Sequence, residues 1–473
     1  MSLDELSRRV RHDLECLSYP APEWVPPRFV DGERVLDVLI VGAGQGGLAT
    51  AFGLARERVT NTLVVDRNRR GGEGPWTTFA RMSTLRTPKE VTGIDLGIPS
   101  LTVRAWYEAA HGQAAWARLD RIPRTVWRDY LDWYRDVLGL AVDNETELVS
   151  IVPEDELLLA RLASPGSVRT VRARKIVLAT GIEGSGRWQM PEIVASRLPE
   201  GRRAHAADPI DFRPLAGRRV AVLGGGASGF DNAGMALEAG AAHVALLLRR
   251  AEVPRVNPFM WTNFSGVLGH FAELPDLLRW RFARQIIEGL PTPPPQETYW
   301  RCRAFPNFDL RTGVDLRSLR FVDGEIRLDA ASGLVRADFL IAATGVETDL
   351  AARRELAGIA DGIALWRHRF LPPEGEESAV VGSHPYLGPA FEFTEREPGS
   401  APFLRNIHNF TFGALPSLGL SAAAVTGMRY GVPRLVAGIV RDLFLADADA
   451  HYRSLLHYDH RELASLEPPP PGR

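Results

Sequence analysis

Short unbroken apolar runs, each closing on glycines or on a charged residue, form the strongest pattern along this chain. Two of them, at 37–41 (DVLIV) and 218–223 (RRVAVL), lead directly into glycine clusters. Each cluster is followed by a stretch of small residues long enough to form a helix. Two more, at 61–66 (NTLVVD) and 243–248 (HVALLL), come next in the sequence. Runs of this length between turn residues are typical of buried parallel strands. The alternation of strands and helices predicts an α/β fold built on two Rossmann-like units.

Two other segments repeat their apolar residues at helical spacing. The N-terminal segment predicts an amphipathic helix lying on the body of the protein, and TVWRDYLDWYRDVL predicts a helix whose aromatic face packs into a core. The residues that carry these two patterns are Leu3, Leu6, Val10, Leu14 and Leu17 in the first, and Trp127, Tyr130, Leu131 and Tyr134 in the second.

Length and composition narrow the class of protein. A chain of 473 residues is too long for one simple core, so two domains are expected. With 45% hydrophobic and 24% charged residues it reads as a soluble globular protein, and the net charge of −2 gives no reason to expect nucleic acid or an anionic membrane as partner. The N-terminus lacks the apolar core of a signal peptide, and the uncharged run 406–428 contains Pro, His and several Gly. We therefore expect a cytoplasmic protein.

Cysteine and histidine usage excludes several kinds of site. Cys16 and Cys302 are the two cysteines, far apart and in no CxxC, so a disulfide framework, a cysteine zinc site and a redox dithiol are not expected. His451, His457 and His460 lack the companions of a metal motif and are interpreted as surface residues, so we expect no metal.

The first glycine cluster has the features of a dinucleotide site. Gly42, Gly44 and Gly47 form GxGxxG directly after a predicted strand, and Asp66 ends the next strand 24 residues after Gly42. Glycines allow the tight turn, the close approach of a pyrophosphate and the packing of helix on strand. An acid at the end of the second strand accepts hydrogen bonds from a ribose diol. This unit is predicted to hold FAD.

The second glycine cluster repeats this geometry with the opposite charge. Gly224, Gly226 and Gly229 form the cluster, and the following strand ends on Arg249 and Arg250 instead of an acid. Arginines at this position pair with a 2′-phosphate, which favours NADPH over NADH. The alternative is that both arginines are merely solvated.

Two further apolar strands, 176–181 (IVLATG) and 340–345 (LIAATG), each close on Ala-Thr-Gly and flank the second cluster. They are similar to the strands that link the FAD and NADPH domains in flavoproteins of the disulfide-reductase type. They predict a split FAD domain, made of residues 1–210 and 340–473, with an NADPH domain inserted at 211–339.

Several motifs together resemble the class B flavoprotein monooxygenases, which include flavin-containing, Baeyer–Villiger and N-hydroxylating enzymes. The segment 70–76 (RGGEGPW) resembles the family's Gly-Gly-x-Trp stretch, with two extra residues before Trp76, and 85–100 (LRTPKEVTGIDLGIPS) is similar to a flavin-containing monooxygenase segment. The stretch 224–233 (GGGASGFDNA) carries the family's SGxD. The family fingerprint Phe-x-Gly-x-x-x-His-x-x-x-(Tyr/Phe/Trp) keeps Gly201 and His205 here, but Pro199 and Pro209 stand at its two aromatic positions.

The resemblance implies a reaction and an oxygen-activating cofactor. NADPH would reduce FAD, O2 would form a C4a-(hydro)peroxyflavin, and a small molecule would be oxygenated in a dry cavity. The weak fingerprint favours N- or S-oxygenation over Baeyer–Villiger insertion. A reductase passing electrons to a quinone or an iron–sulfur partner is the alternative, and a non-catalytic flavin-binding protein is the third hypothesis. Homodimers are common among relatives.

The resemblance and the glycine clusters together nominate site residues. Arg86 stands where flavin-containing monooxygenases carry an active-site Asn and is predicted to stabilise a peroxyflavin or to orient NADP⁺, the alternative being an ion pair with a carboxylate such as Glu90. The segment 254–308 is unlike a Rossmann unit; its part 289–308 is expected to be a proline-rich loop, and substrate contacts are expected from Asn257, Trp261 and Tyr386. The predicted cofactor contacts are Gly42, Gly44, Gln45, Gly46, Gly47, Asp66, Arg67, Trp76, Lys89, Gly181, Gly224, Gly226, Ser228, Gly229, Arg249, Arg250, Gly345, Gly413 and Leu418.

Overall fold

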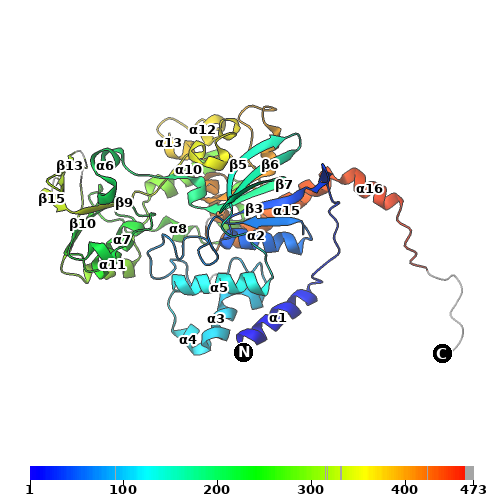
Figure 1. The fold of residues 1–473 in the computed structure, drawn as a ribbon, viewed down its shortest axis with the longest axis horizontal. Coiled ribbons are helices and arrows are strands. Elements are labelled where there is room, and N and C mark those ends of the chain that lie inside the picture. Colours follow the sequence, from blue (N-terminus) through cyan, green and yellow to red (C-terminus); the bar gives the residue numbers. More distant parts are fainter. Residues whose placement is uncertain (91, 315, 317, 331–332, 423, 464–473) are drawn as a thin grey trace.

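The structure is a computed structural model, and it describes residues 1–463 except 91, 315, 317, 331–332 and 423. One sheet forms the centre of the larger part of the molecule (Figure 1). Its order is β4-β3-β7-β6-β5, and a further strand pairs with β7. The strands are β3 (Leu36–Val41), β4 (Thr62–Val65), β5 (Glu147–Glu154), β6 (Leu157–Ser164), β7 (Ser167–Gly181) and β18 (Ile407–Thr411). β3, β4, β7 and β18 run parallel, whereas β5, β6 and β7 form an antiparallel meander.

A second sheet, all parallel, lies at the other end of the molecule (Figure 1). Its order is β12-β11-β10-β16-β9. The strands are β9 (Arg203–His205), β10 (Arg219–Leu223), β11 (His243–Leu247), β12 (Phe308–Arg311) and β16 (Phe339–Ala342). A three-stranded antiparallel sheet lies beside it, formed by β13 (Leu319–Val322), β14 (Glu325–Ala330) and β15 (Gly333–Ala337). The two predicted Rossmann-like units are therefore confirmed, one inserted into the other.

The second sheet takes in residues on both sides of the boundaries expected at 210 and 340. β16 pairs with β9 and with β10, so its apolar run belongs to the inserted unit. The chain leaves that unit only after β16, at Gly345. Just outside this sheet, β8 (Gly186–Trp188) pairs antiparallel with β17 (Val346–Thr348), which joins the two connections between the units. A two-stranded ribbon near the N-terminus consists of β1 (Phe29–Val30) and β2 (Glu33–Arg34).

Helices cover both sheets. Around the first sheet lie α1 (Leu3–Cys16), α2 (Gln45–Arg56), α3 (Val103–His111), α4 (Gln113–Arg118), α5 (Arg124–Val137) and α15 (Met428–Ala446). The predicted face of α5 is confirmed, since Trp127, Tyr130, Leu131 and Tyr134 are buried. That of α1 is confirmed at Leu6, Val10 and Leu14, whereas Leu3 and Leu17 at its two ends are exposed. α2 packs against α15, and α7 (Ala227–Glu238) packs against α11 (Gln296–Arg303). The remaining helices are α6 (Glu192–Arg197), α8 (Pro258–Trp261), α9 (Ser265–His270), α10 (Asp276–Arg284), α12 (Trp366–Arg369), α13 (Ala379–Gly382), α14 (Leu415–Leu418) and α16 (Ala448–Leu456).

The expectation of a loop across 289–308 was wrong in its second half. The proline cluster 291–295 ends at Pro295, the N-cap of α11, where a proline is tolerated because the first helical residues need no donor partner, and α11 begins at Gln296. α11 packs on α7, and Cys302 in it is fully buried, with its Sγ 3.2 Å from the carbonyl oxygen of Phe230.

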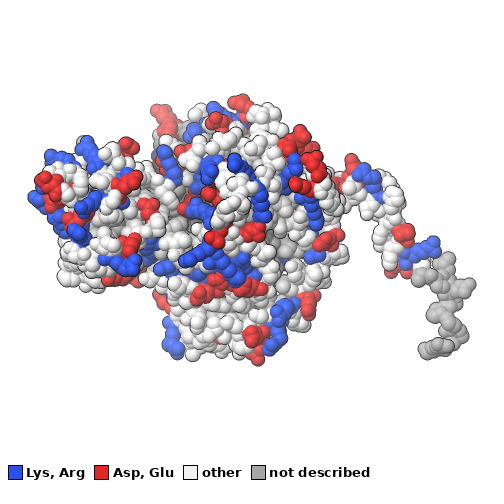
Figure 2. Space-filling model, viewed as in Figure 1, with Lys and Arg blue, Asp and Glu red and all other residues white. Residues whose placement is uncertain are grey.

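Acidic and basic side chains are interspersed over the face of the molecule seen in Figure 2, so that face as a whole is neither mainly acidic nor mainly basic. Within the part of the chain that the structure describes, no helix is both long and apolar enough to cross a bilayer.

Candidate active site

The first glycine turn joins β3 to α2. Gly42 has a φ of +100°, and a Cβ there would lie 2.5 Å from the carbonyl oxygen of Ala179. A Cβ on Gly47 would lie 1.7 Å from the carbonyl oxygen of Gly42, so helix and strand can pack only with glycine. Gly44 is the N-cap of α2 and offers no side-chain cap, which leaves the N–H groups of the first turn available to an anion.

A cavity of about 670 Å³ begins at this turn. Eight of the predicted cofactor contacts line it, together with residues from β5, β7, β18 and the start of α15. These eight are Gly42, Gly44, Gln45, Gly46, Asp66, Arg67, Trp76 and Gly181. Its wall includes Asp66, directly after β4, and Phe410 of β18, and its volume is in the range of sites for small molecules and cofactors.

The polar atoms in the cavity wall fit a bound FAD. Oε1 of Gln45, Nε1 of Trp76 and Oγ1 of Thr180 are buried without a hydrogen-bond partner among the described residues, and all three residues line the cavity. Buried polar atoms normally have partners, so three such atoms facing one cavity indicate a ligand that supplies them.

The adenosine end of the cavity is organised by Asp66. One carboxylate oxygen accepts a hydrogen bond from the backbone N–H of Ala43 at 2.8 Å, and the other accepts from the backbone and side chain of Asn68. These contacts fix the carboxylate beside the glycine turn, where it has acceptor capacity left for a ribose. Two ion pairs stand at the same end: Arg67 with Glu183 at 2.6 Å, and Arg353 with Glu355 at 2.9 Å.

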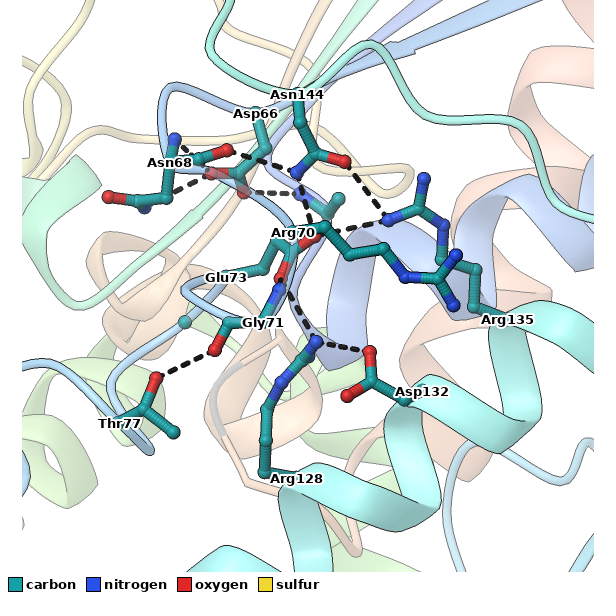
Figure 3. A network of polar contacts seen from close by, with 12 residues as sticks. Asp66, Asn68, Arg70, Gly71, Glu73, Thr77, Arg128, Asp132, Arg135 and Asn144 are labelled. Atoms are coloured by element: carbon teal, nitrogen blue, oxygen red, sulfur yellow. Dashed lines mark hydrogen bonds and ion pairs between the residues drawn. The ribbon is translucent and has the colours of Figure 1, made fainter.

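A buried polar network, drawn in Figure 3, holds the loop between β4 and Trp76. Its centre is Glu73, which is 1% exposed. The Glu73 carboxylate accepts from the backbone of Gly71 at 2.8 Å and from Asn144 at 2.7 Å, and it forms ion pairs of 3.1 Å with both Arg128 and Arg135 of α5. Asn144 also donates to the carbonyl oxygen of Asn68, which links the network to Asp66. Glu73 lies in the segment whose two extra residues distinguish it from the Gly-Gly-x-Trp pattern.

The opposite end of the cavity is largely apolar. Trp76 packs edge-on against Trp127 of α5, with 6.3 Å between ring centroids. The first residue of α15, Met428, reaches the cavity wall, so the positive end of that helix points toward this end. The other wall residues here are Pro75, Thr77, Thr78, Phe79, Ala207, Pro209, Phe410, Phe412 and Ala422.

The second glycine turn repeats the first between β10 and α7. Gly224 has a φ of +113°, and a Cβ on Gly229 would lie 1.8 Å from the carbonyl oxygen of Gly224. Ser228 lies in the first turn of α7, whose N-cap is Gly226. Arg249 and Arg250 follow β11 and are exposed, and neither side chain donates a hydrogen bond to a described residue. Both are therefore available to a ligand.

Arg86 forms an ion pair, but with a partner other than Glu90. Its Nη2 lies 3.2 Å from a carboxylate oxygen of Asp231 in α7, so the pair joins the two units of the molecule. Asp231 is the acid of the SGxD stretch, and burial raises its pKa while the Arg86 charge opposes that shift. The other carboxylate oxygen of Asp231 and Nε of Arg86 are buried without a partner among the described residues.

Apart from the six residues of the second nucleotide unit, five predicted cofactor contacts do not line the cavity. Gly47 packs against the carbonyl group of Gly42 instead. Lys89 donates to the backbone carbonyl groups of Trp116 and Leu119, at the C-terminal end of α4. Gly345 accepts from the backbone of Gln189 at 2.9 Å, between the two units. Gly413 and Leu418 follow β18, and their neighbours Phe412 and Ala422 contribute to the wall instead.

The predicted substrate residues have separate partners. Asn257 caps α8 by accepting from the backbone of Phe259 at 3.0 Å. Trp261 is 56% exposed and stacks on Phe282. The hydroxyl of Tyr386 donates to Asp276, and the Asp276 charge contributes to the raised pKa of this tyrosine after burial.

Sequence reasoning missed several wall and support residues. The wall residues Thr146, Leu148 and Arg353 come from segments without a motif, and no local signal distinguishes them. Arg81 and Arg124 donate to the backbone carbonyl groups of the wall residues Thr78 and Trp76, and they were missed for the same reason. Glu73 carried one possible signal, since it is a charged residue inside a glycine-rich turn.

Two nucleotide-binding sheets, each with its own glycine turn, and one long cavity at the first of them define a flavoprotein oxidoreductase with two dinucleotide-binding units. The comparisons agree. The profile of the pyridine nucleotide-disulphide oxidoreductase family matches residues 36–264. The FAD-dependent urate hydroxylase of Xanthomonas campestris pv. campestris is 45% identical over 477 aligned residues, which cover 99% of each chain.

Solved structures share the fold. An ornithine N-hydroxylase from Kutzneria sp. 744 superposes with a TM-score of 0.65 at 18% identity, covering 86% of this chain and 99% of that one. The ornithine hydroxylase of Pseudomonas aeruginosa gives a TM-score of 0.66 at 17% identity, covering 86% of this chain and all of that one. The chain belongs to the family of the FAD-dependent urate hydroxylase and is an FAD-dependent monooxygenase. The predicted resemblance to class B monooxygenases is thereby confirmed.

Proposed function

We propose that this protein hydroxylates urate, with FAD as resident cofactor and NADPH as electron donor. The observation that carries the proposal is the 45% identity to a urate hydroxylase along 99% of both chains. Identity of this extent spans the glycine turns, the cavity wall and the segments that cover it, rather than a nucleotide-binding unit alone.

The proposed reaction balances with one O2 per urate. One oxygen atom enters the substrate as a hydroxyl group and the other leaves as water, while NADPH gives two electrons as hydride and a proton comes from solvent. Bound FAD supplies the redox chemistry between nicotinamide and oxygen. The chain contributes the phosphate-binding turn at 42–47, the ribose acceptor Asp66, and an apolar wall that excludes water beside Trp76.

The direct test is the stoichiometry of the purified holoenzyme. Urate loss, NADPH oxidation and O2 consumption are followed together, and the proposal expects a ratio of one to one to one. Oxidation of NADPH that yields only hydrogen peroxide, with urate unchanged, would refute urate as substrate. Ornithine, lysine and an organic sulfide in place of urate test N- and S-oxygenation, which the degenerate fingerprint at Pro199 and Pro209 favours over Baeyer–Villiger insertion. A quinone as acceptor tests the reductase alternative.

The preference for NADPH rests on Arg249 and Arg250. Both side chains are exposed at the end of the strand after the second glycine turn, where a 2′-phosphate would lie, and neither donates to a residue that the structure describes. Replacing either by Ala is expected to raise the KM for NADPH by about 10-fold and to leave that for NADH nearly unchanged, since the loss is one charge-assisted hydrogen bond. An equal effect on both nucleotides would contradict the assignment.

A further inference from the structure

The helix α16 projects from the molecule instead of packing on it. In Figure 1 it follows α15 and extends away from both sheets. Each of its nine residues is exposed or half-buried, so every side of the helix faces outward. A helix of this length is not stable alone in water, and short helices persist in proteins because another surface covers their apolar face. A surface that covers α16 is therefore expected.

The large apolar side chains of α16 lie on one face. Ala448, Tyr452, Leu455 and Leu456 follow the spacing i, i+4, i+7, i+8, which places them on one side of a helix. The tyrosine and the two leucines are between 61% and 66% exposed. Exposed apolar residues scattered singly are ordinary, whereas a continuous stripe on a projecting helix indicates an interaction surface.

The direction of α16 is fixed by a buried joint at Asp447, where α15 ends and α16 begins. The Asp447 carboxylate is buried and forms ion pairs of 2.8 Å with both Arg28 and Arg174. Arg174 also pairs with Asp37 at 3.3 Å, which ties the joint to β7 and β3 of the first sheet. The joint therefore holds α16 outward in one orientation and presents its apolar stripe to a partner.

The exposed apolar surface at the joint and on α16 is large enough for a dimer. Its residues are Phe29, Phe444, Leu445, Tyr452, Leu455 and Leu456. At roughly 100 Å² each, they offer roughly 600 Å² per chain. Two copies that cover each other would bury about 1,200 Å², which is the size at which specific interfaces begin.

The charged residues of α16 fit a second copy of the same helix. Asp449 and Arg453 stand four residues apart on one flank of the apolar face, and neither forms an ion pair within the part of the chain that the structure describes. When two identical helices pack antiparallel about a two-fold axis, the same flank of each faces the other in reverse order. The acid at 449 in one copy then meets the arginine at 453 in the other, twice per dimer.

We propose that two copies of this chain associate through α16, whose helices pack antiparallel about a two-fold axis. Leu455 and Leu456 of each copy lie against the joint of the other, near Phe444 and Leu445. An isologous contact of this kind uses one patch twice and closes, so it gives a dimer and not a filament. The proposal concerns assembly and goes beyond the proposed function, because it does not depend on the substrate.

The first test removes apolar area from the stripe. Sedimentation velocity of the FAD-loaded full chain over a range of concentrations measures the dissociation constant of the dimer. Leu455→Ala/Leu456→Ala keeps a good helix former at both positions and is expected to raise that constant about 100-fold or more. The matched control is Leu371→Ala, which truncates a leucine that is 92% exposed beyond α12 and is expected to change nothing. FAD content and far-UV circular dichroism show that each variant is folded.

The second test reverses charges on the flank. Asp449→Arg and Arg453→Asp each set like charges against each other twice per dimer, and each alone is expected to raise the dissociation constant about 10-fold. Mixing the two variants sets the arginines of one chain against the acids of the other. The mixture is therefore expected to form a heterodimer about as tight as the wild-type dimer, a recovery that no partner other than a second copy predicts.

Each outcome supports or overturns the proposal. A wild type that stays monomeric at about 100 µM would overturn it, because interfaces of standard size bind at micromolar concentrations or below. A dimer whose dissociation constant the leucine substitutions leave unchanged would place the interface elsewhere and overturn it as well. Charge variants that weaken the dimer without recovery on mixing would refute the antiparallel order. Urate turnover is measured in the same samples, and its absence would refute the proposed function alone.

Discussion

Glu73 provides the most stringent test of how the cavity is held, because its removal leaves two buried cations facing each other. In Glu73→Gln, the side chain keeps its shape but loses the charge that pairs with Arg128 and Arg135, and one of its two acceptor oxygens becomes a donor. Breaking a buried pair by removing one partner costs about 3–5 kcal/mol. Arg128 keeps Asp132 and Arg135 keeps Asn144, so the lower value, about 3 kcal/mol, is the expected loss.

This loss converts into a measurable shift. If roughly 340 residues of the FAD-binding part unfold together, the unfolding entropy is about 0.7 kcal/mol/K, and about 3 kcal/mol lowers Tm by about 4 °C. The loop from Gly71 to Trp76 should loosen as well, so the dissociation constant of FAD, measured by recovery of flavin fluorescence, should rise.

The matched control lies in the same loop. Arg70 pairs with Asp136, and both side chains are more than half exposed, at 52% and 59%. Exposed pairs contribute at most about 1 kcal/mol, so Arg70→Ala should shift Tm by about 1 °C or less and leave FAD affinity unchanged. Equal effects of the two substitutions, or a Glu73→Gln protein as stable as wild type, would refute the conclusion that the buried carboxylate holds this loop.

Three further predictions test other parts of the structure. Gly47→Ala should abolish soluble folded protein, since its Cβ would lie 1.7 Å from a carbonyl oxygen, whereas Gly44→Ala, whose nearest neighbour is at 3.8 Å, should fold and bind FAD weakly; expression and FAD titration distinguish them. Burial lowers the pKa of His384 to about 4 and that of His408 to about 3. Above pH about 6.5 both histidines are neutral in the folded and in the unfolded state, so they do not change the free energy of unfolding. Below that pH the unfolded state binds protons that the folded state cannot, so the free energy of unfolding should fall by about 1.4 kcal/mol per pH unit per histidine until the pH nears 4. Tm measured against pH should fall less steeply in His384→Asn, and an unchanged slope would contradict the assignment. Arg86→Ala should loosen the contact between the two units and lower the fraction of NADPH oxidation coupled to product; unaltered coupling would exclude the predicted role of Arg86.

The parts of the fold that the sequence predicted are those set by local physics. The turns at Gly42 and Gly224 were predictable because each follows a short apolar strand and needs glycine twice within six residues. The first glycine has a positive φ, and the last allows the helix to pack closely on the turn. The faces of α1 and α5 were predictable because helical periodicity states which side is buried. α11 was missed because the prolines before it end within one residue of its start, and proline marks a helix beginning as readily as a loop.

The support of the site was not predictable for a different reason. Glu73 meets its two arginines across more than 50 residues of sequence, and the Arg86 partner, Asp231, lies in the other unit. A charged residue in a sequence does not disclose its partner, so the nearby Glu90 was as reasonable a choice for Arg86 as any other acid.

The two ends of the cavity differ in the charged groups that surround them. At the adenosine end the cations Arg67 and Arg353 are paired with Glu183 and Glu355, and the Asp66 carboxylate remains as a hydrogen-bond acceptor for the ligand. At the apolar end the wall residues named above are uncharged, and the positive end of α15 points toward them. A low-polarity wall strengthens that field, because few water molecules screen it. Negative charge that develops at the apolar end would therefore be stabilised by a helix terminus, whereas the adenosine end holds its ligand through the glycine turn and the Asp66 carboxylate.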